Sequence, residues 1–459
     1  MKPATPQGTR DFTAQTIRKR NYIFDTIRSV FELYGFEPLE TPAMENLETL
    51  MGKYGDEGDK LIFKILNNGL ANPAKQNQAK KDFEKVLDGK NVNGITERAL
   101  RYDLTIPFAR FVAMNYGELT MPYKRYQMQP VWRADRPQKG RYREFYQCDA
   151  DVVGSYSVIN DAELAEIYLE VFKRLGIEIE LKINSRKILN ALAILCGGAD
   201  KMMSITIAID KIDKLGIDKV KIELEKNGLG PKQISIIEKY LNIAGTNEEK
   251  LQQLIVLFAN IEDGQNGIEE LHSILDFLQS SEIRNEKSEI KIDLTLARGL
   301  NYYTGIIYEV QAKNIAIGSI GGGGRYDDLT GLFGGPNIPG VGISFGVDRI
   351  YDVMEELNIF PEKMQKGATA LFFNMGKKES KFAFKQMQQL RSKSVSCELF
   401  HEPAKMDKQF KYAAKKNIQY AIIIGSKEME TKSCVVKDLT NEEQKIIPLN
   451  ELQNHFKNN

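Results

Sequence analysis

The sequence predicts an α+β fold: an antiparallel sheet, interrupted by a helical insertion and followed by a separate α/β domain. Three patterns predict it: long alternating strands over 101–153, mostly helical periodicity over 186–289, and alternating α and β elements over 367–459. At 459 residues the chain is too long for one ordinary core. We expect two segments of one core at 1–185 and 290–366, with the helical insertion at 186–289 between them and the α/β domain at 367–459 last.

The first expected elements are a helix and an edge strand. Apolar residues recur at helical spacing over 17–34, and Gly35 supplies a stop. The extended run that follows is broken at Pro42, and proline is tolerated in a strand mainly at a sheet edge. Residues 67–94 are rich in asparagine and lysine, which indicates an excursion with one short helix around 82–87.

The next elements are two long antiparallel strands joined across the turn at 136–140. Because side chains alternate along a strand, we expect one face to carry two arginines, an aromatic ring, an amide and two carboxylates. These residues are Arg141, Arg143, Phe145, Gln147, Asp149 and Asp151. Ten steps of about 3.3 Å reach roughly 33 Å, which accommodates a nucleoside triphosphate beside a second small substrate.

The order of groups on this face suits ATP beside an amino acid. Guanidinium groups bind phosphate through paired, charge-assisted hydrogen bonds, an aromatic ring stacks on a purine, and a carboxylate binds an ammonium group. A solvent-facing strand with alternating charges is the alternative, and it would be preferred for an isolated R-x-R-x-F pattern. Two further clusters favour the substrate platform.

The first of these clusters spans 296–305, after a helix at 161–176, a strand at 177–184 and the insertion. It places Arg298, Tyr302 and Tyr303 between glycines. An arginine beside a reacting phosphate stabilises developing charge without proton transfer. A strand turn with packed tyrosines explains the cluster equally well when it is considered alone.

The second cluster combines the glycine run 321–324 with the segment 340–349. Neither matches the P-loop or the dinucleotide-binding glycine pattern, so ATP would lie on a sheet. Arg349 would lie over the base through a cation–π contact. A tight turn is the alternative explanation of the glycine run.

Composition argues against several classes of protein. No apolar run approaches the roughly 18 residues that span a bilayer, and residues 1–12 resemble neither a signal nor a transit peptide. We expect a cytoplasmic protein without a membrane partner. Four cysteines without a C-x-x-C pair and three scattered histidines predict no zinc, no other metal site and no prosthetic group.

The net charge of +1 conceals an asymmetry. Residues 367–459 carry 15 lysines and one arginine against 10 acidic residues, a net +6, so residues 1–366 carry a net −5. The tail therefore suits a phosphate-rich partner. A lysine-rich surface that merely keeps the domain soluble explains the charge alone at least as well.

Together these segments resemble the class II aminoacyl-tRNA synthetases and, among them, the histidyl-tRNA synthetase family. The resemblance covers nearly the whole chain. Residues 17–42 look like motif 1, the dimer element. Motif 2 is matched by Arg133, Asp135 and the R-x-x-x-F from Arg141 to Phe145, and motif 3 by GVGISFGVDR, which ends at Arg349.

Three more segments carry the resemblance to the histidyl family. ARGLNYYTG at 297–305 and GGGRYDDL at 322–329 are similar to its two histidine-specific signatures, and TPQGTRDF opens the chain as in the family. Two features depart from the pattern. Asn301 stands where the family more often has aspartate, and the excursion at 67–94 is longer than expected.

The resemblance implies a class II antiparallel catalytic sheet and a C-terminal α/β anticodon-binding domain. It implies ATP-dependent ligation of L-histidine to tRNA(His) through histidyl-adenylate, with Mg²⁺ accompanying ATP, by a homodimer. The insertion would clasp the acceptor arm of the tRNA.

It also implies roles for individual residues. Catalysis would depend on Arg298 and Arg133. Histidine would be bound by Asp103, Leu104, Thr105, Arg133, Gln147, Asp151, Arg298, Tyr302 and Tyr303. ATP would be bound by Arg133, Asp135, Arg141, Arg143, Phe145 and Arg349. The tRNA acceptor end would contact Arg136 and Gln138.

Two alternatives were weighed. The family has a paralogue that serves as a non-catalytic regulatory subunit of ATP phosphoribosyltransferase, but that paralogue lacks the tail domain. A related synthetase for threonine, proline or glycine would share the core, and the segment 298–305 argues against it.

Overall fold

The computed structural model describes residues 2–52, 55–280, 288–297, 302–361 and 367–456, and only the backbone at 55–57 and 213–214. Arg298 and Asn301 therefore lie outside the described residues. The chain separates into two compact units, Met1–Phe360 and Pro361–Asn459. The finer division at 185, 289 and 366 stays a prediction.

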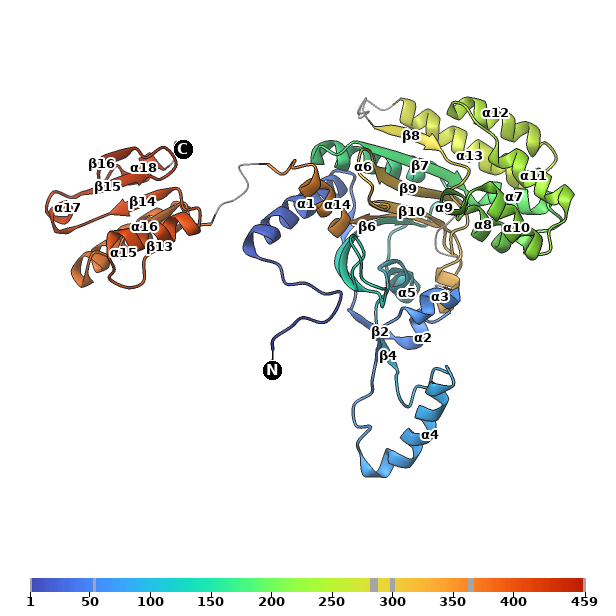
Figure 1. The fold of residues 1–459 in the computed structure, drawn as a ribbon, viewed down its shortest axis with the longest axis horizontal. Helices are drawn as coiled ribbons and strands as arrows, with labels where there is room; N and C mark the ends of the chain where they lie inside the picture. Colours follow the sequence, from blue (N-terminus) through green and yellow to red (C-terminus); the bar gives the residue numbers. More distant parts are fainter. Residues whose placement is uncertain (1, 53–54, 281–287, 298–301, 362–366, 457–459) are drawn as a thin grey trace. The chain divides into compact units, whose positions relative to one another are not determined.

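The first unit is built on an eight-stranded sheet in the order β1-β5-β6-β11-β10-β9-β7-β8 (Figure 1). The strands are β1 (Glu37–Pro38), β5 (Tyr123–Trp132), β6 (Glu144–Val153), β7 (Ile179–Ser185), β8 (Glu289–Ile292), β9 (Ile306–Ala312), β10 (Gly321–Tyr326) and β11 (Gly340–Gly346). Only the outermost pairs, β1 with β5 and β7 with β8, are parallel. The predicted antiparallel hairpin is β5 and β6, and the edge strand β1 ends at Pro38, before the predicted break at Pro42.

Three helices cover one face of this sheet: α1 (Ala14–Leu33), α6 (Ile159–Leu175) and α14 (Val347–Glu356) (Figure 1). Helix α1 begins three residues before the predicted helix, and α6 ends at Gly176, whose φ of 72° is the left-handed value that favours glycine. The layers meet in aromatic contacts, since the Phe345 ring lies 5.8 Å from Phe31 and 4.8 Å from Tyr168. This buried contact fixes β11 against the helices.

A small second sheet packs beside α5 (Thr105–Asn115), with strands β2 (Met44–Asn46), β4 (Arg98–Leu100) and β3 (Lys64–Ile65) in that order. Short helices α2 (Leu47–Leu50), α3 (Gly55–Lys60) and η3 (Thr330–Phe333) complete the region. Its core joins Leu50, Phe108 and Val112 to Val153 and Tyr326 of the large sheet. The segment before α5 is thereby held against β6 and β10.

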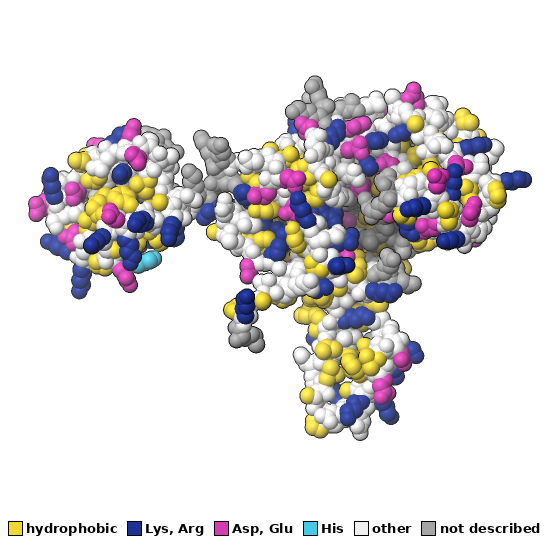
Figure 2. Space-filling view, in the orientation of Figure 1, with side chains coloured by type: hydrophobic (Ala, Val, Ile, Leu, Met, Phe, Trp, Pro, Cys, Tyr) yellow, Lys and Arg dark blue, Asp and Glu magenta, His cyan; other side chains and the backbone are white. Residues whose placement is uncertain are grey.

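The excursion predicted at 67–94 leaves this small sheet between β3 and β4. It contains η1 (Pro73–Lys75) and α4 (Gln76–Leu87), a longer helix than the predicted one at 82–87. The segment projects away from the sheets, and hydrophobic side chains gather on its visible face (Figures 1 and 2). Leu66, Phe83 and Leu87 are the large exposed ones.

The stretch between β7 and β8 contains only helices among its described residues, as its periodicity predicts. They are α7 (Arg186–Leu195), η2 (Ala199–Lys201), α8 (Met202–Ile209), α9 (Ile212–Leu215), α10 (Ile217–Lys226), α11 (Pro231–Leu241), α12 (Asn247–Leu257) and α13 (Glu262–Gln279). Within the described chain, no single helix is long and apolar enough to cross a membrane. Among the described residues, one sharply bent pair of helices, Arg186–Leu195 and Ala199–Ile209, reaches the required length and apolar composition when the two are counted together.

The second unit has a five-stranded sheet in the order β13-β12-β14-β15-β16. Its strands are β12 (Ala370–Phe372), β13 (Cys397–Leu399), β14 (Tyr420–Ile423), β15 (Ser433–Asp438) and β16 (Gln444–Pro448), and its helices are α15 (Lys377–Arg391), α16 (Met406–Lys415), α17 (Ser426–Glu430) and α18 (Leu452–His455). Phe372 packs in one hydrophobic cluster while Leu371 and Phe373 pack in another. Both faces of the sheet are therefore buried, which is the arrangement of a three-layer α/β domain.

Candidate active site

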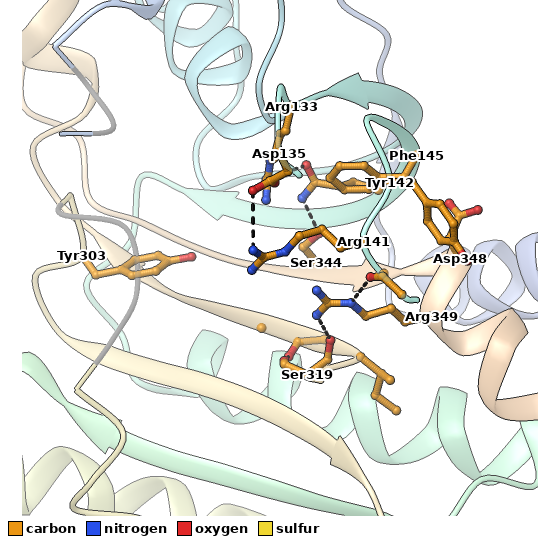
Figure 3. A pocket seen from close by; sticks show the side chains of 16 residues that line it. Arg133, Asp135, Arg141, Tyr142, Phe145, Tyr303, Ser319, Ser344, Asp348 and Arg349 are labelled. Atoms are coloured by element: carbon orange, nitrogen blue, oxygen red, sulfur yellow. Dashed lines mark hydrogen bonds and ion pairs between the residues drawn. The ribbon is translucent and has the colours of Figure 1, made fainter. Parts of the chain in front are cut away.

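A pocket lies on the large sheet beside β6, β10 and β11 (Figure 3). It is lined by Arg133, Asp135, Gly140, Arg141, Tyr142, Phe145, Gln147, Tyr303, Ser319, Ile320, Gly321, Gly322, Ser344, Gly346, Asp348 and Arg349. It therefore combines residues from the hairpin, the glycine run and the segment that ends at Arg349, as the sequence predicts.

Arg133 stands where the hairpin loop meets the segment before α5. Its Nε donates to the Tyr102 carbonyl at 3.0 Å, and its Nη2 lies 3.4 Å from Gln147 Oε1. The guanidinium carbon lies 4.3 Å from the Tyr102 ring and 5.1 Å from the Phe145 ring. These contacts hold the cation in place beside the pocket, where it can meet an anionic substrate group.

The end of the pocket beside the hairpin loop holds two more arginines (Figure 3). Arg141 Nη1 lies 3.6 Å from Asp135 Oδ1, and its side chain is 49% exposed. Arg349 donates from Nε to the Gly140 carbonyl at 2.7 Å and from Nη1 to the Ser319 carbonyl at 2.5 Å. Guanidinium groups and the Phe145 ring thus surround an open space suited to a triphosphate and a purine.

The prediction that alternate residues from Arg141 to Asp151 share one strand face is wrong for Arg141 and Arg143, because β6 begins only at Glu144. Arg141 and its neighbour Tyr142 both line the pocket, whereas Arg143 does not. Arg143 instead donates to the Asp135 and Gln7 carbonyls at 3.1 and 3.4 Å. The chain around 133–143 is a loop against which the N-terminal segment packs, so strand alternation does not apply to it.

Arg136 and Gln138, the residues expected at the tRNA acceptor end, are exposed on this same loop. Gln138 also lines a second hollow, shared with Arg141, Tyr303 and Arg349, next to the pocket. The structure therefore places them beside the pocket rather than inside it.

Two buried carboxylates, Asp149 and Asp151, lie further along β6, each only 2% exposed. Arg125, directly opposite Asp151 on β5 and fully buried, places Nη2 2.9 Å from Asp151 Oδ2. The Tyr326 hydroxyl donates to Asp151 Oδ1 at 2.5 Å. A Cβ at position 342 would lie 2.0 Å from Asp151 Oδ1, so only glycine leaves room for this carboxylate.

Within the part of the chain that the structure describes, Arg125 is the one buried cation that pairs with these two buried carboxylates. Burial raises the pKa of both carboxyl groups, to about 7 for Asp149, and Arg125 lowers both only in part. Among the described residues, Asp149 Oδ1 has no hydrogen-bond partner. The cluster is therefore complementary to a cationic or N–H-rich ligand group.

The segment before α5 joins this cluster. Asp103 Oδ1 accepts from the Ile106 amide at 3.1 Å, and the Leu104 carbonyl lies 3.4 Å from Arg125 Nη2. Thr105 is the first residue of α5. Leu104 is thus brought close to Asp151 through Arg125.

Tyr302 and Tyr303, which precede β9, lie beside the same carboxylates. Their ring centroids are 5.0 Å apart, and the Tyr302 hydroxyl lies 3.4 Å from Asp103 Oδ2. Tyr303 lines the pocket, and burial raises its pKa. A Cβ on Gly324 would lie 3.0 Å from the Tyr303 ring. The glycine run is strand β10, which pairs with β9 and β11, and not the tight turn given as the alternative.

Arg125, Tyr326 and Ser344 are site residues that the sequence did not predict, whereas strand alternation predicted Asp149 on the substrate-facing side. Ser344 accepts from Gln147 Nε2 at 2.8 Å and faces Asp149 across the β6–β11 pair. Tyr326 lies inside the GGGRYDDL segment, so the family resemblance could have pointed to it. The predicted hairpin already places Arg125 opposite Asp151, but its role as the buried partner of that carboxylate was not predicted.

The described residues contain no group of three or more His, Cys, Asp or Glu side chains placed to hold a metal ion. All four cysteines are buried and free.

An open antiparallel sheet with such a pocket on one face is the catalytic architecture of the class II aminoacyl-tRNA synthetases. Residues 70–350 match the family model described as histidyl-tRNA synthetase, and residues 370–459 match the model of the anticodon binding domain. The chain belongs to the histidyl-tRNA synthetase family.

Curated relatives and solved structures support the same family assignment. A histidine–tRNA ligase from Bacteroides fragilis is 50% identical over 98% of both chains, and one from Phocaeicola vulgatus is 49% identical over 98% of both. The crystal structure of histidyl-tRNA synthetase from Nostoc sp. PCC 7120 is 32% identical, with a TM-score of 0.80, covering 100% of this chain and 99% of that one.

A further solved structure bears on the regulatory alternative. An ATP phosphoribosyltransferase regulatory subunit/histidyl-tRNA synthetase from Bacillus halodurans has a TM-score of 0.72 at 21% identity, covering 93% of this chain and 100% of that one. At that identity the likeness shows a shared fold alone. The ligase relatives at about 50% identity favour the ligase function over the regulatory one.

Proposed function

We propose that this chain ligates L-histidine to tRNA(His) at the pocket on its large sheet, in two steps. Membership of the family and the ligase relatives support the activity. The observation that carries the assignment to this pocket is its division into an arginine-rich end and an end with buried excess negative charge.

In the first step a histidine carboxylate oxygen attacks the α-phosphorus of ATP in line. The new bond joins that oxygen to phosphorus, the α–β phosphoanhydride bond breaks, and pyrophosphate leaves. In the second step a hydroxyl of the terminal adenosine of the tRNA attacks the carbonyl carbon of histidyl-adenylate, and AMP leaves. Neither step requires a covalent enzyme intermediate, so orientation and charge stabilisation carry the catalysis.

Histidine would lie over the buried cluster. Asp151 and Asp103 suit its ammonium and imidazole N–H groups, while Gln147, Tyr302 and Tyr303 shape the space around the ring. The Leu104 carbonyl and Thr105 would complete that end. Arg133, fixed between Tyr102 and Gln147, would bind the substrate carboxylate and the α-phosphate together.

ATP, as its Mg²⁺ complex, would occupy the other end. Arg141 would reach the γ-phosphate, with Asp135 orienting it, and Phe145 and Arg349 would enclose adenine. Arg143 is better suited to holding the loop, since its side chain donates to two carbonyls outside the pocket. Arg136 and Gln138 would meet the tRNA acceptor end from the exposed loop.

Further parts of the proposal concern tRNA and assembly. The helices of 186–289 would clasp the acceptor arm, and the C-terminal unit, which matches an anticodon-binding model and is rich in lysine, would bind the anticodon. A homodimer through the region of α1 is supported by the motif 1 resemblance and by exposed Leu33. The cytoplasm, where tRNA is charged, is the expected location.

The test is ATP–pyrophosphate exchange by the purified chain against a panel of amino acids. We expect exchange with histidine and with no other amino acid. Exchange with another amino acid would disprove the substrate assignment, and an absence of exchange would favour the regulatory alternative.

Arg298 is proposed as the arginine that stabilises charge at the α-phosphate. Arg298→Ala should lower the rate of adenylate formation by about 10² to 10³, the typical value of one electrostatic donor. Single-turnover quench-flow measures this rate, with circular dichroism as a control for the fold. A single-turnover rate equal to that of the parent chain would refute the role.

The C-terminal unit is proposed to act on tRNA alone. A chain that ends at residue 360 keeps the entire first unit with its own core, so exchange should fall less than about threefold while aminoacylation falls by about 10² or more. Equal losses in both assays would contradict an anticodon-binding role.

A further inference from the structure

Arg186, the first residue of α7, joins the helical insertion to the segment that carries Tyr302 and Tyr303. This helix follows β7 directly, with Ser185 as its N-cap, whose Oγ accepts from the Lys187 amide at 3.2 Å. Ser185 on β7 pairs with Ile306 on β9. Arg186 therefore lies beside Gly305, the residue that precedes β9.

Arg186 contacts the segment between β8 and β9 at two points, one in its interior at Ala297 and one at its end at Gly305. Its backbone amide donates to the Gly305 carbonyl at 2.8 Å, and its Nη1 donates to the Ala297 carbonyl at 3.2 Å. A single residue thereby holds the chain before and after the tyrosine pair. The preceding residue adds to this, because Asn184 Nδ2 donates to the Leu296 carbonyl at 3.0 Å.

The environment of Arg186 is unusual for an arginine whose only task is a surface ion pair. Burial lowers its pKa, and it is the sole cause of that shift. Its Nε is buried and has no hydrogen-bond partner among the described residues. Removing a guanidinium group from water costs free energy unless the group is hydrogen-bonded. The hydrogen bond to the Ala297 carbonyl therefore offsets part of the cost of burying Arg186.

The tyrosine pair is anchored on its other side by a separate set of contacts. The Thr304 amide donates to the Arg325 carbonyl at 2.8 Å, and Thr304 Oγ1 donates to Asp327 Oδ2 at 2.7 Å. These contacts hold only the residue that follows Tyr303. The hydrogen bond from Arg186 to Ala297 therefore holds the chain on the N-terminal side of the tyrosine pair, which the Thr304 contacts do not reach.

We propose that Arg186 is a positioning residue for the histidine end of the pocket, which places Tyr302 and Tyr303 by holding Ala297 and Gly305 at a fixed separation. This role rests on the proposed function of the pocket. Arg186 lies on the first helix of the insertion, so it also ties the position of the tyrosines to the seating of α7 against α13.

The test is steady-state pyrophosphate exchange with Arg186→Met, which keeps much of the aliphatic length and removes the donors. We expect the KM for histidine to rise about tenfold or more, the usual cost of losing a hydrogen bond from a charged group. The KM for ATP should change less than twofold, because the groups proposed for ATP lie on the hairpin loop and α14. Arg186→Lys keeps one donor and should recover part of the loss.

The matched control is Lys187→Met, the next residue of the same helix. Its Nζ pairs with Glu270 at 2.6 Å, and neither Ala297 nor Gly305 is among its hydrogen-bond partners within the described chain. It should leave both KM values unchanged. Should Arg186→Met fail to fold, Arg186→Lys and Arg186→Gln provide the same comparison.

Equal rises in both KM values, or a parent-like KM for histidine in Arg186→Met, would overturn the inference and leave a structural role only. Failure of the proposed function is distinguishable, because the parent chain would then show no histidine-dependent exchange at all.

Discussion

The two ends of the pocket are built in opposite ways. At the ATP end, Arg141 is half exposed, and Arg349 is held by carbonyls of a loop and of the segment before β10. At the histidine end, Arg125, Asp149 and Asp151 are buried between paired strands. The ATP end presents charges to the open pocket, whereas the histidine end depends on charges that folding has already removed from water.

This difference indicates which end of the pocket determines substrate selectivity and which end affects the stability of the fold. Exposed arginines cost little to maintain and bind any suitably placed phosphate. A buried cluster is expensive to form, but a ligand that leaves its carboxylates unpaired is strongly rejected. We therefore expect changes at the histidine end to affect both stability and recognition, and changes at the ATP end to affect binding alone.

The largest expected effect on stability follows from Arg125→Met. It leaves Asp149 and Asp151 buried without their cation, which typically costs about 3 to 5 kcal/mol. Urea unfolding of the first unit measures the loss. Arg141→Met is the control and should change stability by less than about 0.5 kcal/mol, because that arginine is half exposed. Similar losses in the two variants would break the comparison.

The next effect is a pH dependence that comes from Asp149. Its pKa is raised to about 7 in the folded chain, compared with about 3.9 in an unfolded one. The folded chain therefore keeps a proton that the unfolded chain loses, so the stabilisation is fully present below about pH 4 and is lost as the pH rises to about 7.

Asp149→Asn stays neutral throughout and should remove this dependence. Urea unfolding at pH 4.5 to 8 should show the parent chain losing stability relative to the variant as the pH rises, by up to a few kcal/mol. Parallel stability curves for the two proteins would show that Asp149 does not titrate in this range.

Much of the fold follows from local patterns, and the ATP end follows with it. The hairpin, the sheet-covering helices at 17–34 and 161–176, and the pocket residues Arg133, Phe145 and Arg349 all follow from the sequence. The orientation of Arg143 does not, because it depends on a loop and on the packing of the N-terminal segment.

The histidine end could be predicted only in part. Asp151 and Gln147 followed from alternation along one strand and from the family resemblance. Arg125 depends on the register of the hairpin. Tyr326 reaches Asp151 across β11, which lies between β10 and β6, so this contact joins distant parts of the chain. The glycines of β10 and β11 make this packing possible, and their sequence pattern alone suggested a turn.

The central claim is that one pocket holds histidine and ATP at separate ends. Pyrophosphate exchange kinetics of Tyr326→Phe and Arg349→Met, with each substrate varied in turn, test it most directly. Tyr326→Phe should raise the KM for histidine about tenfold and leave the KM for ATP unchanged, because it removes only the hydrogen bond to Asp151. Arg349→Met should do the reverse. If each variant raises both KM values equally, the division of the pocket is wrong.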